Sequence, residues 1–213
     1  METNDNRAII IIGGGGHARV LTDILLKQGK DIIGYTEIKS GHDTGFSAIN
    51  YIGNDEVIFS YHPEKVFLVN GIGSINLESL KKRENIFRKF SARGYKFPGI
   101  ISNYAIVSEF AHLHDGVQIM NSATVQSCVS IGENSIINTG VIIEHDCRIG
   151  NSIHIASGAV IFGGVSIGNC THIGAGATII QSVSIGENVL VAAGAVVVKD
   201  VPSGLTVKGI PAK

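Results

Sequence analysis

An unbroken six-residue period runs through the second half of the chain and limits the folds open to it. Every sixth position from 107 to 197 is aliphatic, without a slip in phase. An α-helix of 3.6 residues per turn, or a strand alternating every two residues, would scatter these side chains over several faces. A coil of short parallel strands keeps them on one inner surface. The aliphatic positions are Val107, Leu113, Ile119, Val125, Ile131, Ile137, Ile143, Ile149, Ile155, Ile161, Ile167, Ile173, Ile179, Ile185, Val191 and Val197.

A second period of eighteen residues is superposed on the first. Gly132, Gly150, Gly168 and Gly186 follow one another at this interval. Three six-residue units therefore make one turn, and each residue is expected to lie beneath the one eighteen positions later, about 4.8 Å away. Such a coil has three short sides and an interior filled with isoleucine and valine, which suits a chain with 27 glycines and no tryptophan.

The first hundred residues show a different pattern, in which strands alternate with helices. We predict strands over residues 7–12, 31–35 and 66–70, helices over 17–28 and 75–93, and an extended lead into the coil over 96–101. This order is typical of a small βαβ domain with a parallel sheet. The sequence thus predicts two domains, an α/β domain over residues 1–101 and an all-β solenoid over residues 102–213.

A glycine-rich loop, Gly13-Gly14-Gly15-Gly16-His17-Ala18, lies between the first predicted strand and its helix. It fits the GxGxxG/A pattern of a Rossmann-like phosphate loop, in which the backbone approaches a phosphate at the positive end of a helix. The acidic residue that usually follows about twenty positions later could be Asp31 or Glu37. A tight turn is the alternative reading, and so short a domain cannot supply both halves of a complete NAD site.

The composition excludes several classes of function. A net charge of −1 gives no broad basic field for nucleic acid or an anionic membrane. No apolar run near the polar N-terminus approaches the roughly 20 residues that a membrane span requires. Three cysteines without zinc-site spacing favour reduced thiols and a cytoplasmic protein.

One six-residue unit, residues 143–148, carries the side chains best suited to catalysis. His145 and Asp146 occupy its corner, where other coils have small or amide residues. An imidazole can accept a proton at neutral pH, and a neighbouring carboxylate holds its tautomer. Eighteen positions on, Gly163 and Gly164 offer backbone N–H groups that could stabilise an oxyanion. A solvated corner histidine is the alternative reading.

Two further histidines, His154 and His172, are stacked on one face of the coil by their spacing of eighteen. The positions below and above them, Ile136 and Leu190, are apolar, so no metal site is expected. His154 lies half a coil from His145, and the two can meet only across a neighbouring subunit. Four other histidines belong to no motif and are read as ordinary surface or core residues, namely His42, His62, His112 and His114.

With these motifs the whole chain resembles the bacterial nucleotide-sugar N-acetyltransferases of the hexapeptide-repeat family, which are related to the sialic acid O-acetyltransferases. The resemblance implies a left-handed parallel β-helix, acetyl-CoA as co-substrate, no metal, and a homotrimer with active sites at the subunit interfaces. It implies acetylation of an aminodeoxy sugar linked to UDP, dTDP or GDP, for bacterial surface glycans or glycoproteins. Some members read uracil with two aspartates, whereas this chain has Thr36-Glu37, which leaves the base open.

The resemblance also implies roles for individual residues. His145, supported by Asp146, would be the general base, and Gly163 with Gly164 would provide the oxyanion donor. Acetyl-CoA would contact the corner and tail residues His154, Gly174, Ala175, Ala193, Lys208 and Pro211. The nucleotide sugar would contact Gly14, Gly15, Gly16, His17, Thr36, Glu37, Gly73 and Asn138.

Three other functions fit parts of the pattern. Acetylation of a hydroxyl, as on sialic acid, would use the same coil and base. A γ-type carbonic anhydrase would need a His-x4-His pair for zinc, which the sequence does not contain. A non-catalytic solenoid would leave His145 and Asp146 unexplained.

Overall fold

A computed structural model describes residues 7–38 and 48–213. His42 therefore lies outside the described residues. The chain forms two compact units. The described residues before Ser74 join Asn85–Pro98 in the first unit, and Ser74–Glu84 joins Gly99–Lys213 in the second.

The first unit contains a four-stranded parallel sheet in the order β3-β2-β1-β4. The predicted strands and helices are confirmed with small shifts at their ends, but β3 and a 3-10 helix, η1, were not predicted, because both are short. The elements that precede the coil are β1 (Ala8–Ile12), α1 (Gly16–Lys27), β2 (Ile32–Thr36), β3 (Tyr51–Gly53), η1 (Asp55–Ser60), β4 (Val66–Asn70) and α2 (Leu77–Ser91). The division into units falls within α2, after Glu84.

The core of this unit explains why the strands read as continuous apolar runs. Ile10, Ile12 and Leu68 are buried among the aromatic rings of Phe87 and Phe90. A parallel sheet with both faces covered requires such apolar strands. In this sheet the strands β1 and β2 end next to each other, with Ile12 paired to Thr36.

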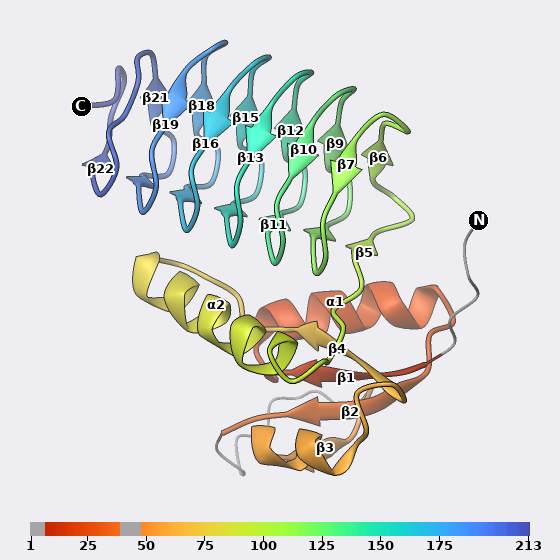
Figure 1. Cartoon of the computed structure of the whole chain (residues 1–213). Coiled ribbons are helices and arrows are strands. Elements are labelled where there is room, and N and C mark those ends of the chain that lie inside the picture. The colour runs from red at the N-terminus through yellow and green to blue at the C-terminus, as the bar shows by residue number, and fades with distance from the viewer. Residues whose placement is uncertain (1–6, 39–47) are drawn as a thin grey trace. The chain divides into compact units, whose positions relative to one another are not determined.

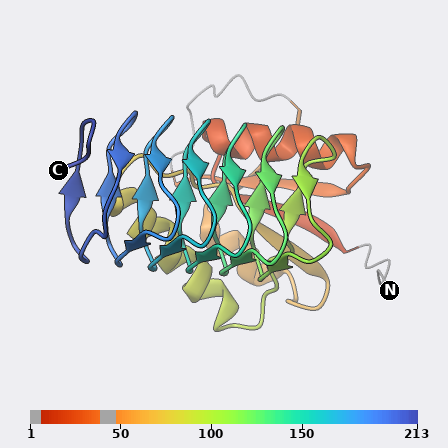
Figure 2. The same cartoon turned by 90° about the horizontal axis from the view of Figure 1, so that it is seen from above.

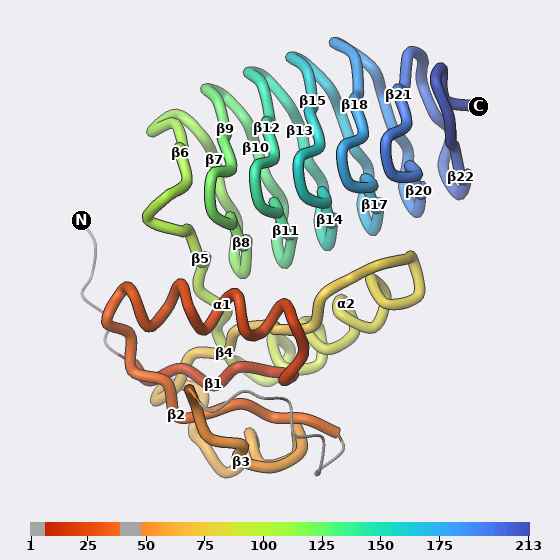
Figure 3. Tube along the Cα trace, turned by 180° about the vertical axis from the view of Figure 1, so that it is seen from behind, coloured from red at the N-terminus to blue at the C-terminus, as the bar shows by residue number. Residues whose placement is uncertain are grey.

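The second unit contains the predicted coil, and the chain turns through the coil from β5 to β22 (Figure 1; Figure 3). Its strands form three parallel sheets of seven, six and five members. Figure 2 shows strands of successive coils lying side by side. The seven-stranded sheet contains β5 (Ile100–Ile101), β8 (Gln118–Ile119), β11 (Ile136–Ile137), β14 (His154–Ile155), β17 (His172–Ile173), β20 (Leu190–Val191) and β22 (Thr206–Val207). The six-stranded sheet contains β6 (Ile106–Val107), β9 (Thr124–Val125), β12 (Ile142–Ile143), β15 (Val160–Ile161), β18 (Thr178–Ile179) and β21 (Val196–Val197). The five-stranded sheet contains β7 (His112–Leu113), β10 (Ser130–Ile131), β13 (Arg148–Ile149), β16 (Ser166–Ile167) and β19 (Ser184–Ile185).

The register confirms the eighteen-residue period. Ile137 pairs with Ile155, and Ile155 pairs with Ile173. The aliphatic side chains at these positions form one buried ladder. The recurring glycines permit this close stacking, since a Cβ atom at Gly168 would lie 2.7 Å from the backbone of Gly186 and Glu187.

Candidate active site

His145 and Asp146 form a corner of the coil between β12 and β13. Asp146 has a φ of +61°, in the left-handed region, which aspartate tolerates better than most side chains. The corner is fixed to the coils on both sides: the Asp146 N–H donates to the Ser127 carbonyl at 3.1 Å, and the Gly164 N–H donates to the His145 carbonyl at 2.9 Å. The backbone thus presents both side chains from a defined position.

The two side chains are paired. Nδ1 of His145 lies 2.7 Å from Oδ2 of Asp146, and their side chains are 66% and 64% exposed. An ionised carboxylate only accepts hydrogen bonds, so in the neutral form of the imidazole Nδ1 carries the proton and Nε2 keeps its lone pair. The pair therefore has the geometry of a general base whose tautomer is set by its neighbour.

The imidazole of His145 packs on Gly163, one coil further on. A Cβ atom at Gly163 would lie 2.8 Å from Cε1 and 2.9 Å from Nε2 of this ring. Only glycine at position 163 leaves the ring room to lie there. Stacking of these two positions, predicted from the spacing, is therefore observed.

The two glycine N–H groups differ in availability. The Gly164 N–H is already bonded to the His145 carbonyl, so the expectation that both groups are open needs correction. Within the described part of the chain, the Gly163 N–H donates to no other group. Gly163 alone is left as a possible oxyanion donor.

His154 is buried on β14 and is held by a chain of hydrogen bonds. Its Nδ1 lies 2.7 Å from the Ser74 carbonyl and therefore donates, while Nε2 faces Nδ2 of Asn138 at 3.2 Å. Oδ1 of Asn138 in turn accepts from the Thr139 N–H at 2.7 Å. The structure thus joins Asn138 and His154, which the sequence assigned to different ligands. Ser74 acts through a backbone carbonyl, which has no sequence signal.

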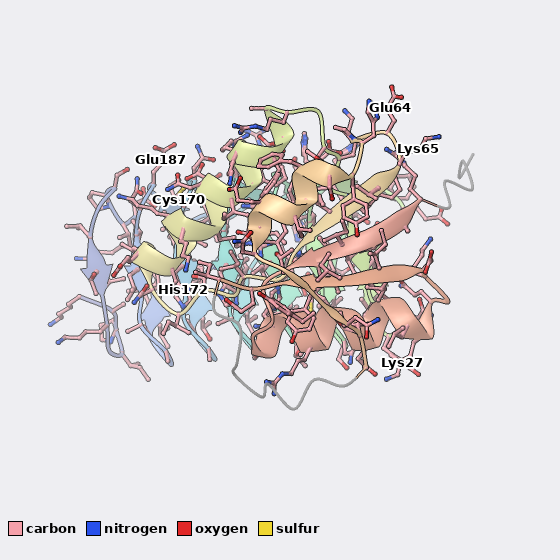
Figure 4. The ribbon with its side chains drawn as sticks, turned by 90° about the horizontal axis from the view of Figure 1, so that it is seen from below. Lys27, Glu64, Lys65, Cys170, His172 and Glu187 are labelled. Atoms are coloured by element: carbon pink, nitrogen blue, oxygen red, sulfur yellow. The ribbon has the colours of Figure 1, made fainter. Side chains whose placement is uncertain are left out.

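His172 lies next to His154 on β17, with ring centroids 5.0 Å apart in an edge-to-face arrangement. It is buried, and its Nδ1 has no hydrogen-bond partner among the described residues. Burial lowers the pKa of His172. Next to it, the buried Cys170 donates to Glu84 on α2 at 2.9 Å, and burial raises the pKa of this thiol to about 12 (Figure 4).

The residues expected to contact acetyl-CoA fall into two groups. Ala175, Ala193, Lys208 and Pro211 are exposed on corners and on the tail. Gly174, by contrast, is buried, and a Cβ atom there would meet the Ala192–Ala193 backbone. Gly174 therefore serves the stacking of coils, and the exposed surface of this corner is provided by the alanines.

The glycine loop lies between β1 and α1, as expected. Helix α1 begins at Gly16, has no side-chain cap and has no acidic residue in its first turn. Side chains added at Gly15 or Gly16 would meet open space. Gly73 lies beside His17, because its Cβ atom would be 3.1 Å from that of His17.

Thr36 is the last residue of β2 and Glu37 follows it, and the two side chains have different surroundings. Thr36 is fully buried and donates its hydroxyl to Asp55 at 2.6 Å, so its side chain is not presented to a ligand. Glu37 is half-buried, and its Oε2 accepts from the Gly14 N–H at 3.0 Å. The link between Glu37 and the glycine loop, and the role of Asp55, were not foreseen, because they depend on strand order.

In the described residues no group of three or more histidine, cysteine or acidic side chains could hold a metal ion. No helix in the same part of the chain is both long and apolar enough to cross a membrane.

Known protein families match both the N-terminal and the C-terminal half of the chain. Residues 8–90 match the PglD N-terminal domain, and residues 110–144 and 164–199 match the bacterial transferase hexapeptide repeat. A perosamine N-acetyltransferase variant from Caulobacter crescentus, solved with CoA and GDP-perosamine, is 31% identical, with a TM-score of 0.89 over 97% of this chain and 95% of that one. The acetyltransferase domain of PglB from Neisseria gonorrhoeae, solved with acetyl coenzyme A, is 31% identical, with a TM-score of 0.91 over 98% of each chain.

The fold and these matches define an acyltransferase built on a left-handed parallel β-helix with a Rossmann-like N-terminal domain. Within that class, the chain belongs to the nucleotide-sugar N-acetyltransferase family. The predicted fold class, family and enzyme class are therefore confirmed.

Proposed function

We propose that this protein transfers the acetyl group of acetyl-CoA directly to the amine of an aminodeoxy sugar carried on a nucleoside diphosphate. The observation that carries the proposal is the His145–Asp146 pair, 2.7 Å apart, with the imidazole packed on Gly163. The similar proteins solved with CoA, acetyl coenzyme A and GDP-perosamine support the same substrates.

In this reaction Nε2 of His145 accepts a proton from the sugar amine as the nitrogen attacks the thioester carbonyl. Asp146 holds the Nδ1–H and stabilises the imidazolium that forms. The Gly163 N–H donates to the developing oxyanion. When the C–S bond breaks, the imidazolium returns its proton to the CoA thiolate, so the enzyme forms no covalent intermediate.

Two separate surfaces of the chain bind the two substrates, acetyl-CoA and the nucleotide sugar. Exposed Ala175 and Ala193 leave room for the pantetheine arm, with Lys208 near the CoA phosphates and Pro211 against the adenine. His154 is assigned to the thioester end, and Asn138 to the sugar. On the first unit, the open loop at Gly15, Gly16 and His17, with Gly73 beside it, receives the diphosphate at the start of α1.

We propose that the active enzyme is a homotrimer with its sites at the subunit interfaces. In one chain the His145–Asp146 pair is largely exposed, and apolar side chains next to it, Ile142 and Phe162, are 37% and 42% exposed. A second copy of the chain would cover them and exclude water from the site. We place the reaction in the cytoplasm, in keeping with the three free cysteines.

The decisive test is activity with a panel of UDP-, dTDP- and GDP-linked amino sugars, measured as release of CoA thiol. His145→Ala should lower kcat by ~10²–10⁴-fold while acetyl-CoA still binds, which is the usual contribution of a positioned general base. Asp146→Asn should lower it less. Turnover of His145→Ala close to that of the wild type would refute the mechanism. Acetylation of free sialic acid, with no binding of nucleoside diphosphates, would replace the N-acetylation proposal by O-acetylation.

A further inference from the structure

His172 is a buried polar side chain whose ring nitrogens are not used by the chain itself. It lies on β17 (labelled in Figure 4) and is only 8% exposed. Among the described residues neither nitrogen has a hydrogen-bond partner, and the ring meets His154 edge to face. Buried polar groups without a partner are rare in folded proteins. This ring therefore indicates a partner from outside the chain.

The surroundings of His172 decide which nitrogen carries the proton. Burial lowers the pKa of His172, so the ring is neutral at neutral pH. Nδ1 is sealed from solvent, whereas Nε2 is the nitrogen that remains accessible. A buried N–H without an acceptor is rarer than a buried acceptor without a donor, so the proton belongs on Nε2. His172 thus presents one N–H donor at the accessible edge of its ring.

The neighbouring His154 has no N–H to spare. Its Nδ1–H donates to the Ser74 carbonyl at 2.7 Å, and its Nε2 accepts from Nδ2 of Asn138 at 3.2 Å. The amide of Asn138 is oriented by the Thr139 N–H, which donates to Oδ1 at 2.7 Å. Of the two stacked rings, therefore, only that of His172 can donate to a carbonyl oxygen of a ligand.

The acetyl-CoA proposed for this face has a carbonyl group at a matching distance. His154 and His172 pair in register, one coil apart, with ring centroids 5.0 Å apart. The corner at residues 174–176, with the exposed Ala175, follows β17 directly. The pantetheine amide carbon nearest the thioester lies four bonds from the sulfur, about 5 Å along an extended chain. An arm that starts at His154 and runs towards Ala175 brings this amide to His172.

We propose that the Nε2–H of His172 donates a hydrogen bond to the carbonyl oxygen of the pantetheine amide nearest the sulfur of acetyl-CoA. The inference rests on the proposed function, in which His154 contacts the thioester end. It makes His172 a binding residue for the acyl donor, which fixes the position of the thioester along the coil. The contact also gives Nε2 the partner that the chain does not supply.

Calorimetric titration of the full chain with three ligands tests this hydrogen bond. The ligands are CoA, an analogue in which two methylene groups replace the amide nearest the sulfur, and a second analogue with the same change at the other amide. The first analogue should bind the wild type about fivefold more weakly than CoA, or worse. In His172→Phe, which keeps a ring but has no nitrogen, the two should bind within about twofold of each other. The ratio for the second analogue should be the same in both proteins.

His112→Phe, the same change at an exposed histidine on β7, is the matched control and should keep the wild-type ratios. Equal binding of CoA and the first analogue by the wild type would overturn the inference even if His172→Phe failed to fold. A wild-type ratio that persists in His172→Phe, or a dependence on His172 found for the second analogue instead of the first, would overturn it as well. If CoA does not bind the wild type at all, the proposed function itself fails, and the inference fails with it.

Discussion

At the scale of single residues, the proposed catalytic site depends on a glycine, Gly163, which has no side chain. The His145 ring occupies the space that any Cβ at position 163 would fill, and the neighbouring N–H of Gly164 is already used. In the proposed mechanism Gly163 therefore has two roles: it leaves room for the imidazole of the general base, and its N–H is the backbone donor that remains available. Both depend on the register of two coils rather than on the local sequence.

Gly163→Ala tests this arrangement. The added methyl group would displace the His145 ring, which can rotate into solvent, so the fold should persist while kcat falls by about 10–100-fold. Gly99→Ala is a suitable control, because its Cβ atom would make only an ordinary 3.6 Å contact. Steady-state kinetics and the thermal midpoint of both variants give the comparison. A Gly163→Ala enzyme with full kcat would show that the ring does not need this seat.

His172 makes stability depend on pH. Burial lowers its pKa in the folded chain, so the unfolded chain takes up a proton at higher pH. Stability is therefore full above the unfolded value of about 6.5 and decreases as the pH falls below it. His172→Phe keeps a ring next to His154 but does not titrate.

Between pH 7.5 and 5.5, the Tm of the wild type should fall by about 2–4 °C more than that of His172→Phe. Differential scanning calorimetry measures both. His62→Gln, a change at an exposed histidine, should follow the wild type. Equal slopes in all three proteins would exclude His172 as the cause.

At the scale of elements, the sequence predicted the coil almost to the residue, because each ladder position is set by a local six-residue rule. Strand β3 and η1 were missed, since three to six residues of mixed polarity have no strong period. The contacts of Glu37 with Gly14 and of His154 with Ser74 were missed for another reason. They join residues 23 and 80 positions apart, and one partner in each is a backbone group.

Two glycines of the loop, Gly14 and Gly15, are expected to have different roles, one structural and one in binding. Gly15→Val should raise the KM for the nucleotide sugar by about tenfold or more and leave that for acetyl-CoA nearly unchanged, because the added Cβ atom meets no other group of the protein and would occupy the space proposed for the diphosphate. Gly14→Ala should instead reduce stability, since its methyl group meets the Tyr35 ring. Parallel kinetics and thermal unfolding distinguish the two. Loss of stability in Gly15→Val with unchanged KM values would make the loop a structural turn.

At the scale of the whole molecule, a single chain leaves the side chains proposed for catalysis exposed to solvent. The His145–Asp146 pair is largely exposed, whereas His154 lies on a different side of the coil, on β14 rather than at the end of β12. A base in bulk water gains little from preorganised dipoles. The homotrimer proposal resolves this, because each site would take His145 from one protomer and His154 from its neighbour.

Mixing two inactive variants tests the shared site directly. His145→Ala and His154→Ala should each have little activity as purified homo-oligomers. Co-expressed in equal amounts, they should regain about a quarter of wild-type activity, since one interface in four of a random cyclic trimer then combines both intact histidines. Light scattering should give the mass of about three chains for every sample. Mixed oligomers without activity, when differently tagged copies are shown to co-purify, would place both histidines in the site of one protomer.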